Sequence, residues 1–307
     1  MNPYSYTAGE PHFNLQLKKT TSRWLHYAVD FLTAHPTRYE KNSIVRGEYF
    51  QPQKASHAPL AILLHGMGDR SVIPCRLLAR SLVKKGIACF ILYLVFHSSR
   101  MPEVIRKRLP ALTHDEWFES YRVSVIDVRQ VLDWASGRAE INQEQIALFG
   151  LSFGGFISAI TMGIDKRIRA GVLATSGGNF GKIGWLSKTF SARMGRSYTE
   201  AEYRQAQKLY AQYREQVAEK GFENVTPAQK GFQTDPLTFA PYLRQRPILM
   251  INALWDEVIP REAAIDFWEA CDKPTITWFP ATHATIWFWY PFISRKIGRF
   301  LKSTLEI

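Results

Sequence analysis

Gly150-Leu151-Ser152-Phe153-Gly154 lies between two apolar runs, and this stretch decides the fold of the chain. The run before it, residues 145–149, is typical of a short buried strand, and the run after it, residues 155–160, is typical of a buried helix. A serine on a tight strand-to-helix turn holds its hydroxyl on a strained backbone, and the flanking glycines relieve the crowding. The pattern predicts a nucleophilic serine. The alternative is a glycine-rich turn that only lets a helix pack closely on a sheet.

Strand-like and helix-like segments alternate from about residue 43, which predicts a parallel sheet with helices on both faces. The expected strands are 43–50, 60–65, 87–96, 145–149, 170–175, 247–252 and 275–279. The expected helices are 71–85, 115–136, 153–163, 261–271 and 284–303. The alternation stops over residues 177–240, where Thr199 with Glu202 predicts the start of a helix that Gly221 ends. We expect this insertion to cover the carboxyl edge of the sheet as a lid.

The first 42 residues are predicted to form a helical extension that packs on the main domain. Leu25, Ala28, Val29 and Leu32 fall on one helical stripe, within an expected helix over residues 21–34 that Pro36 stops. The predicted division of the chain is therefore an extension over 1–42, a core made of 43–176 and 241–307, and a helical cap over 177–240.

Candidate catalytic side chains follow the expected strands. Ser152 follows the strand at 145–149, Asp256 follows the strand at 247–252, and His283 follows the last strand. Reactive groups in an open parallel sheet collect at the carboxyl ends of the strands, so we expect these three to meet. A serine hydroxyl needs a base; His283 would take its proton and Asp256 would orient and stabilise the imidazole. Glu257 is the rival acid.

The loop after the second expected strand reads His65-Gly66-Met67-Gly68. We expect the backbone N–H groups of Met67 and Phe153 to form an oxyanion hole, since acyl transfer develops negative charge on the carbonyl oxygen. Gly66 and Gly68 would let the loop turn inward. His65 is expected to brace this loop by hydrogen bonds, and His65, Gly66 and Gly68 are assigned to the substrate-binding side of the site.

Together these motifs resemble the α/β-hydrolase superfamily. The resemblance covers residues 43–304 and is carried by 65–68, 150–154, Asp256 and His283. It implies an α/β fold with a mostly parallel, eight-stranded sheet flanked by helices, a helical cap inserted after the sixth strand, and hydrolysis without a cofactor. Esterases and dienelactone-hydrolase-like enzymes are the most similar branch, although true dienelactone hydrolases carry cysteine where Ser152 stands.

Substrate choice is expected to depend on the cap and on the loop at residues 97–102. Arg100 is a candidate contact for an anionic substrate group, and the alternative is an ordinary surface charge. Trp185 in the cap suggests an apolar acyl pocket, or simple packing, and Asn179 is expected at the pocket mouth.

The composition narrows the function classes. The 307 residues carry a net charge of +12, but the basic residues are scattered without a nucleic-acid-binding signature, so no nucleic-acid partner is expected. No metal-ligand spacing is present, so no metal is expected. The resemblance to the α/β-hydrolase superfamily implies that no other cofactor is needed. Three dispersed cysteines and the lack of a signal-peptide pattern predict a cytoplasmic protein. The basic, aromatic residues near the end of the chain allow a weak peripheral membrane contact.

The function expected from these residues is a carboxylesterase-like serine hydrolase that cleaves a carboxylic ester or thioester through an acyl-enzyme. A peptidase or amidase with the same three side chains is the first alternative. The second is a non-catalytic binding protein on the same scaffold, which the complete Ser-His-Asp set disfavours. The partner would be a small-molecule ester, and the sequence predicts no particular oligomeric state.

Overall fold

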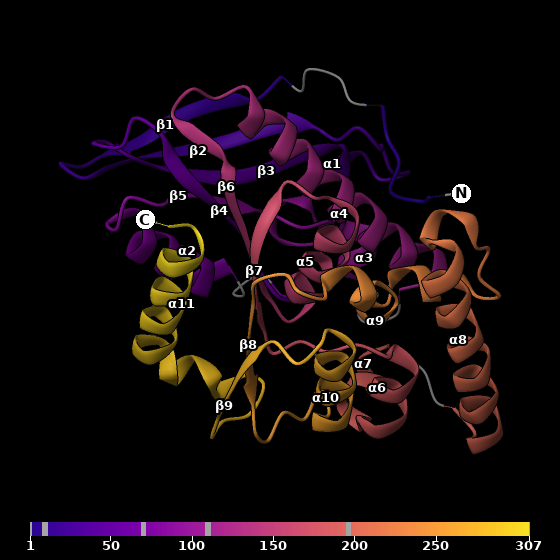
Figure 1. Cartoon of the computed structure of the whole chain (residues 1–307). Helices are drawn as coiled ribbons and strands as arrows, with labels where there is room; N and C mark the ends of the chain where they lie inside the picture. The colour runs from indigo at the N-terminus through magenta and orange to yellow at the C-terminus, as the bar shows by residue number, and fades with distance from the viewer. Residues whose placement is uncertain (1, 8–11, 69–71, 108–111, 195–197, 307) are drawn as a thin grey trace.

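A nine-stranded sheet forms the centre of the protein (Figure 1). The computed structural model describes residues 2–7, 12–68, 72–107, 112–194 and 198–306, without the side chains of 193 and 194. The strand order is β1-β2-β3-β5-β4-β6-β7-β8-β9. The bounds are β1 Asn14–Thr20, β2 Trp24–Leu32, β3 Ile44–Pro52, β4 Ala58–Leu64, β5 Ala88–Leu92, β6 Ile141–Leu151, β7 Ile168–Ala174, β8 Ile248–Ala253 and β9 Thr275–Phe279.

Six adjacent strands, from β5 through β9 in the sheet order, run parallel, and β1, β2 and β3 extend the sheet in antiparallel fashion. This confirms the prediction of a mostly parallel sheet, and all seven expected strands are present. The expected strand at 87–96 ends early, at Leu92, because the chain turns there and Phe96 adopts a φ of 59°.

Helices cover both faces of the sheet (Figure 1). The α-helices are α1 Glu40–Ser43, α2 Val72–Val83, α3 Glu103–Arg106, α4 His114–Ser136, α5 Phe153–Ile164, α6 Phe180–Leu186, α7 Lys188–Met194, α8 Glu200–Lys220, α9 Pro236–Phe239, α10 Arg261–Ala270 and α11 Tyr290–Thr304. The 3₁₀ turns are η2 Ser98–Arg100, η3 Phe222–Asn224, η4 Lys230–Thr234, η5 Ala240–Leu243 and η6 Thr285–Trp289. All five helices expected outside the insertion are present. The helix expected over 71–85 corresponds to α2, and its expected first residue, 71, lies outside the described residues.

Alternation along the buried strands divides the core into two layers. In β4, Leu60, Ile62 and Leu64 face one layer, whereas Ala61 and Leu63 face the other. The first layer packs against α4, α5 and α10, and the second packs against α2 and α11. Because the central strands are apolar on both faces, they can form only inside such a three-layer arrangement.

The prediction of a helical N-terminal extension is wrong. Residues 14–20 and 24–32 are strands, and β2 pairs with β3 along its whole length. Burial along β2 repeats every two residues rather than every 3.6, since Val29 and Phe31 are buried whereas Leu32 is 70% exposed. Phe13 stacks on both Phe31 and Trp134, which fixes this strand face against α4.

The sheet has nine strands rather than the eight that were expected, because β1 adds an outer strand beyond β2. The cap therefore follows the seventh strand, β7, which is the sixth when counting starts at β2. The described part of the insertion is helical from Phe180 onward, and its longest helix, α8, begins with the expected capping box of Thr199 and Glu202 and ends at Gly221.

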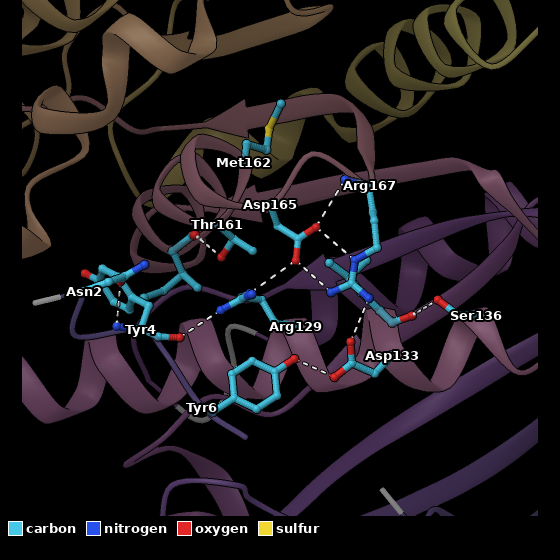
Figure 2. Close-up of polar contacts among 12 residues, drawn as sticks. Asn2, Tyr4, Tyr6, Arg129, Asp133, Ser136, Thr161, Met162, Asp165 and Arg167 are labelled. Atoms are coloured by element: carbon cyan, nitrogen blue, oxygen red, sulfur yellow. Dashed lines mark hydrogen bonds and ion pairs between the residues drawn. The ribbon is translucent and has the colours of Figure 1, made fainter. Parts of the chain in front are cut away.

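A polar network ties the N-terminal segment to α4 and to the turn between α5 and β7 (Figure 2). Arg129 of α4 donates to the Tyr4 carbonyl and to Asp165. Arg167 bridges Asp165 and Asp133, and Asp133 also accepts from the hydroxyl of Tyr6. The shared carboxylates hold the end of α5 against α4, on the side of the sheet opposite α2 and α11.

The three cysteines are free and buried, and burial raises the pKa of each thiol. Within the described residues, no helix combines the length and apolar character needed to cross a bilayer.

Candidate active site

Ser152 lies on the sharp turn between β6 and α5, with a φ of 49°. Positive φ is rare for a residue with a side chain, so neighbouring contacts must hold this conformation. A Cβ on Gly150 would lie 2.2 Å from the Gly154 carbonyl oxygen, and a Cβ on Gly154 would lie 2.3 Å from that of Leu64. The glycines are therefore required by close backbone packing between the turn and the end of β4.

His283 and Asp256 converge on this serine from the ends of β9 and β8. The His283 Nε2 lies 3.0 Å from the Ser152 Oγ. Its Nδ1 lies 2.9 and 2.8 Å from the two carboxylate oxygens of Asp256. Since a carboxylate only accepts, the Nδ1 carries the proton and the Nε2 is left to accept from the serine hydroxyl. The arrangement can abstract the serine proton as the hydroxyl attacks a carbonyl carbon.

The two adjacent acids have different partners. Asp256 also accepts from the backbone N–H groups of Val258 and Ile259, at 2.9 and 2.8 Å, which fixes the carboxylate facing the imidazole. Glu257 accepts from the backbone N–H of His283 at 3.0 Å, and its own carbonyl accepts from the Ser187 hydroxyl at 2.6 Å. Glu257 thus holds the loop of His283 and the cap together, whereas Asp256 holds the ring.

The two predicted oxyanion donors lie beside one cavity. Phe153 is the first residue of α5, where a backbone N–H has no acceptor within the helix, and Met67 lies in the loop after β4. Gly66 of that loop lies against the serine, since a Cβ there would be 3.4 Å from the Cβ of Ser152. Gly68 has a φ of 95° and lines the same cavity as Met67 and Phe153. Its neighbour Asp69 lies outside the described residues.

His65 braces the loop, but its assignment to the substrate-binding side is wrong. The ring is fully buried; its Nδ1 donates to the Gly66 carbonyl at 2.7 Å and its Nε2 accepts from the Leu94 N–H at 3.1 Å. Burial, with the nearby His97 and Arg100, lowers the pKa of His65 to about 3. A neutral ring with one donor and one acceptor satisfies both contacts.

The prediction that Arg100 meets a substrate anion is also wrong, as is the surface-charge alternative. Arg100 is fully buried and pairs with Asp127 at 2.8 Å. It donates further to the carbonyls of Tyr93 and Asn42, at 2.8 and 2.7 Å. A buried guanidinium needs this set of acceptors, so it fixes the loop after β5 instead of facing the site.

Asn179 and Trp185 are not brought to the serine either. Asn179 caps α6 in a left-handed conformation and exchanges two hydrogen bonds with Gln207 of α8. Trp185 stacks on Tyr203 with centroids 5.0 Å apart, and neither Asn179 nor Trp185 lines the two cavities described next. Both residues join the helices of the cap.

Two cavities adjoin the start of α4, and neither is lined by Ser152 or His283. The smaller has a volume of about 150 Å³ and is lined by Met67, Phe153, His97 and Trp117 among others. The larger, of about 890 Å³, lies between α4 and the cap helices α6, α7 and α8. Trp117 lines both.

Sequence reasoning missed Trp117 as a residue of these cavities, whereas His97 belongs to the loop at residues 97–102 that was expected to affect substrate choice. His97 stacks on Phe153 with centroids 5.6 Å apart, and Trp117 contacts the same ring edge-on at 6.3 Å. The available signal was position, since Trp117 and Tyr121 are one turn apart at the start of a helix that begins at the carboxyl edge of the sheet. Their helical spacing indicated only core packing. No cluster of three or more metal-ligating side chains occurs among the described residues.

Comparisons with known proteins agree with the fold. A family model described as alpha/beta hydrolase domain containing 18 matches residues 36–205. Two uncharacterized proteins of Mycobacterium tuberculosis, from strains CDC 1551 / Oshkosh and ATCC 25618 / H37Rv, are 23% identical over 184 residues, 60% of this chain. The matched part of this chain spans 37% of the length of those relatives.

Solved structures with the same fold include two acetyl xylan esterases. The enzyme from Paenibacillus sp. R4 has a TM-score of 0.65 at 17% identity, over 96% of this chain and 89% of that one. Acetyl xylan esterase 1 from Thermoanaerobacterium sp. JW/SL YS485 has a TM-score of 0.61 at 14% identity, over 94% and 88% of the two chains. This likeness confirms the predicted α/β-hydrolase fold.

Proposed function

Because the chain belongs to the family of alpha/beta hydrolase domain containing 18, we propose that it is a serine hydrolase that cleaves a carboxylic ester or thioester. The observation that carries the proposal is the contact of 3.0 Å between the His283 Nε2 and the Ser152 Oγ, on a ring whose other nitrogen contacts Asp256. Three residues from three different strand ends meet only if the fold brings them together.

The proposed reaction begins when the Ser152 Oγ attacks the ester carbonyl carbon while His283 takes the hydroxyl proton. The resulting oxyanion would accept hydrogen bonds from the backbone N–H groups of Met67 and Phe153. Collapse of this intermediate breaks the bond to the alcohol or thiol, which leaves with the proton from His283. Water then attacks the acyl-enzyme by the same steps, which releases the acid and restores the serine.

The electrostatic setting supports this order of events. When the His283 ring becomes cationic, it remains beside the Asp256 carboxylate, whose own orientation is fixed by two backbone donors. The oxyanion would form at the N-terminus of α5, where the helix dipole favours negative charge.

A fluorophosphonate probe tests the proposal, because it labels only an activated serine. We expect the wild-type protein to be labelled and Ser152→Ala to remain unlabelled. Absence of labelling in the wild type, or equal labelling of the variant, would overturn the assignment. Ser158, which is fully buried in α5, offers a matched control: Ser158→Ala should be labelled as the wild type is.

Ester preference over amide preference requires a separate measurement. We expect kcat/KM for a p-nitrophenyl ester to exceed that for the matching p-nitroanilide, because the anilide nitrogen is the poorer leaving group and His283 is the general acid that the described residues supply for it. A higher rate on the anilide would make the protein an amidase with the same site.

A further inference from the structure

The larger cavity lies under the cap, between the start of α4 and the helices α6, α7 and α8. Its volume of about 890 Å³ falls within the range of roughly 300–1,000 Å³ that is usual for sites of drug-sized ligands. An ester with a single small acyl group would leave most of this volume unfilled. The cavity therefore suits a larger group.

The lining of the cavity is unusually aromatic. Of its 24 described lining residues, nine are Phe, Tyr or Trp, and none is Leu, Ile, Val or Met. These rings come from every wall, with Tyr121 on α4, Phe180 on α6, Phe190 on α7, Tyr210 on α8 and Phe232 on η4. Rings present flat faces and edges that favour contact with another ring system over contact with a flexible aliphatic chain.

Most polar groups around the cavity already have partners inside the protein. The Gln207 amide pairs with Asn179, and the Asp235 carboxylate accepts from the backbone N–H groups of Asn179 and Leu237 at 2.8 and 2.9 Å. The hydroxyl of Tyr210 contacts that of Thr238 at 3.0 Å. These internal bonds keep the polar side chains in place and leave the ring surfaces as the main contact for a ligand.

The indole N–H of Trp117 differs, because it is buried and has no acceptor among the described residues. The whole side chain of Trp117 is only 8% exposed. An unpaired buried donor costs stability unless some other group accepts from it. This N–H is itself covered, so the ring carbons of Trp117, and not its nitrogen, are what the cavity offers to a ligand.

Trp117 also lines the smaller cavity, together with Met67 and Phe153, the two proposed oxyanion donors. Trp117 is therefore a wall shared by the cap cavity and the cavity beside the proposed oxyanion donors.

From these observations the geometry points to an aromatic ring system, of the size of two or more fused rings, as the part of the ester substrate that fills the cap cavity. This assignment rests on the proposed function for its substrate, but it concerns binding and is tested without turnover.

The test measures the affinity of the full-length Ser152→Ala protein for 2-naphthyl acetate and for decahydro-2-naphthyl acetate by isothermal titration calorimetry. We expect the aromatic ester to bind about tenfold more tightly than its saturated counterpart, since each ring pair contributes beyond its buried area. A second substitution in this protein, Ala206→Trp, fills the cavity from α8 and should weaken binding of 2-naphthyl acetate about tenfold. Ala211→Trp, on the exposed face of the same helix, is the matched control and should leave it unchanged.

A second variant covers the case in which Ala206→Trp does not fold. Trp117→Leu removes one of the rings that line the cavity, so it should weaken binding of 2-naphthyl acetate about fivefold and binding of decahydro-2-naphthyl acetate much less. Equal affinity for the aromatic and saturated esters, or no effect of the Ala206 and Trp117 variants, overturns the assignment. Failure of fluorophosphonate labelling with these binding results intact would instead overturn the proposed function.

Discussion

At the scale of single residues, the site depends on which of two adjacent acids faces His283. Asp256 contacts the ring nitrogen, whereas Glu257 contacts only the backbone of the same histidine. The Asp256 carboxylate can fix the tautomer and stabilise the cationic ring, and the Glu257 carboxylate can do neither.

Asp256→Asn should therefore lower kcat by about 10⁴, because an amide can donate to the Nδ1 and favour the wrong tautomer. Glu257→Gln should lower it far less, since a side-chain oxygen remains to accept from the His283 N–H. Steady-state rates on a p-nitrophenyl ester measure both. Equal losses in the two variants would contradict the assignment of Asp256.

His65 makes a separate contribution, to the pH dependence of stability. Its pKa is about 3 in the folded protein, where burial is the main cause, against about 6.5 when unfolded. Between about pH 3 and pH 6.5, the unfolded state therefore binds one more proton than the folded state. Stability is lost as the pH falls from about 6.5 toward 3.

Substituting His65→Gln should remove this part of the pH dependence. Between pH 6.5 and 5.0, the free energy of unfolding of the wild type should fall by about 1.6 kcal/mol more than that of the variant. Urea unfolding at the two pH values gives the difference. His57→Gln changes an exposed histidine, so its free energy of unfolding should fall by as much as that of the wild type. The same fall in all three proteins would refute the role of His65.

At the scale of secondary-structure elements, the strained serine depends on how closely β6, α5 and β4 approach one another. Gly154 allows the first turn of α5 to lie directly on the end of β4. Any side chain at this position must push the two elements apart.

Gly154→Ala should destabilise the protein by about 3 kcal/mol, as overpacking against a backbone does, and lower Tm by at least about 5 °C. Gly137→Ala is the matched control, because its nearest neighbouring atom would be 3.7 Å from the new Cβ. Thermal unfolding followed by circular dichroism compares the two. A Tm for Gly154→Ala as high as that of the control would contradict the packing described for the turn.

Helix α11 presents a second feature at this scale. Phe292, Arg295, Arg299 and Lys302 are exposed and recur at helical spacing, opposite the buried Ile293, Ile297 and Leu301. The three cations form no ion pair with any described residue. Phe288, which is 85% exposed, precedes this stripe and follows His283 by five residues.

We expect this stripe to give the weak peripheral membrane contact, through cations that each contribute about 1 kcal/mol at an anionic surface. Arg295→Glu combined with Arg299→Glu should reduce flotation with phosphatidylglycerol vesicles. Lys208→Glu with Lys220→Glu, an equal charge change on exposed positions of α8, should not. Equal flotation of both double variants would show that only net charge matters.

The elements that the sequence predicted well are those whose burial repeats a simple pattern. The strands β4, β6, β7 and β8 are apolar on both faces, and Gly150 and Gly154 mark the turn between β6 and α5. The N-terminal strands could not be distinguished in this way, because residues 25–32 match a helical stripe and an alternating strand almost equally. Pairing with β3, a contact distant in sequence, decides between them.

At the scale of the whole molecule, the meeting of the three proposed catalytic residues was predictable because topology alone brings them together. In a parallel sheet, the ends of β6, β8 and β9 must lie at one edge, so Ser152, Asp256 and His283 could be placed without coordinates. The positions of Arg100 and His65 could not be predicted in this way, because burial and ion pairing depend on tertiary contacts. The same is true of the cap cavity, which needs the relative positions of α4, α6 and α8.

The proposed function depends on acylation of Ser152 during turnover. The most direct measurement is mass spectrometry of peptides from protein that is quenched with acid during reaction with p-nitrophenyl acetate. We predict an added acetyl group on the peptide containing Ser152, at that residue, and no such addition in Ser152→Ala. An acetyl group at another residue, or product release with no acetylated Ser152 at any quench time, would contradict the account.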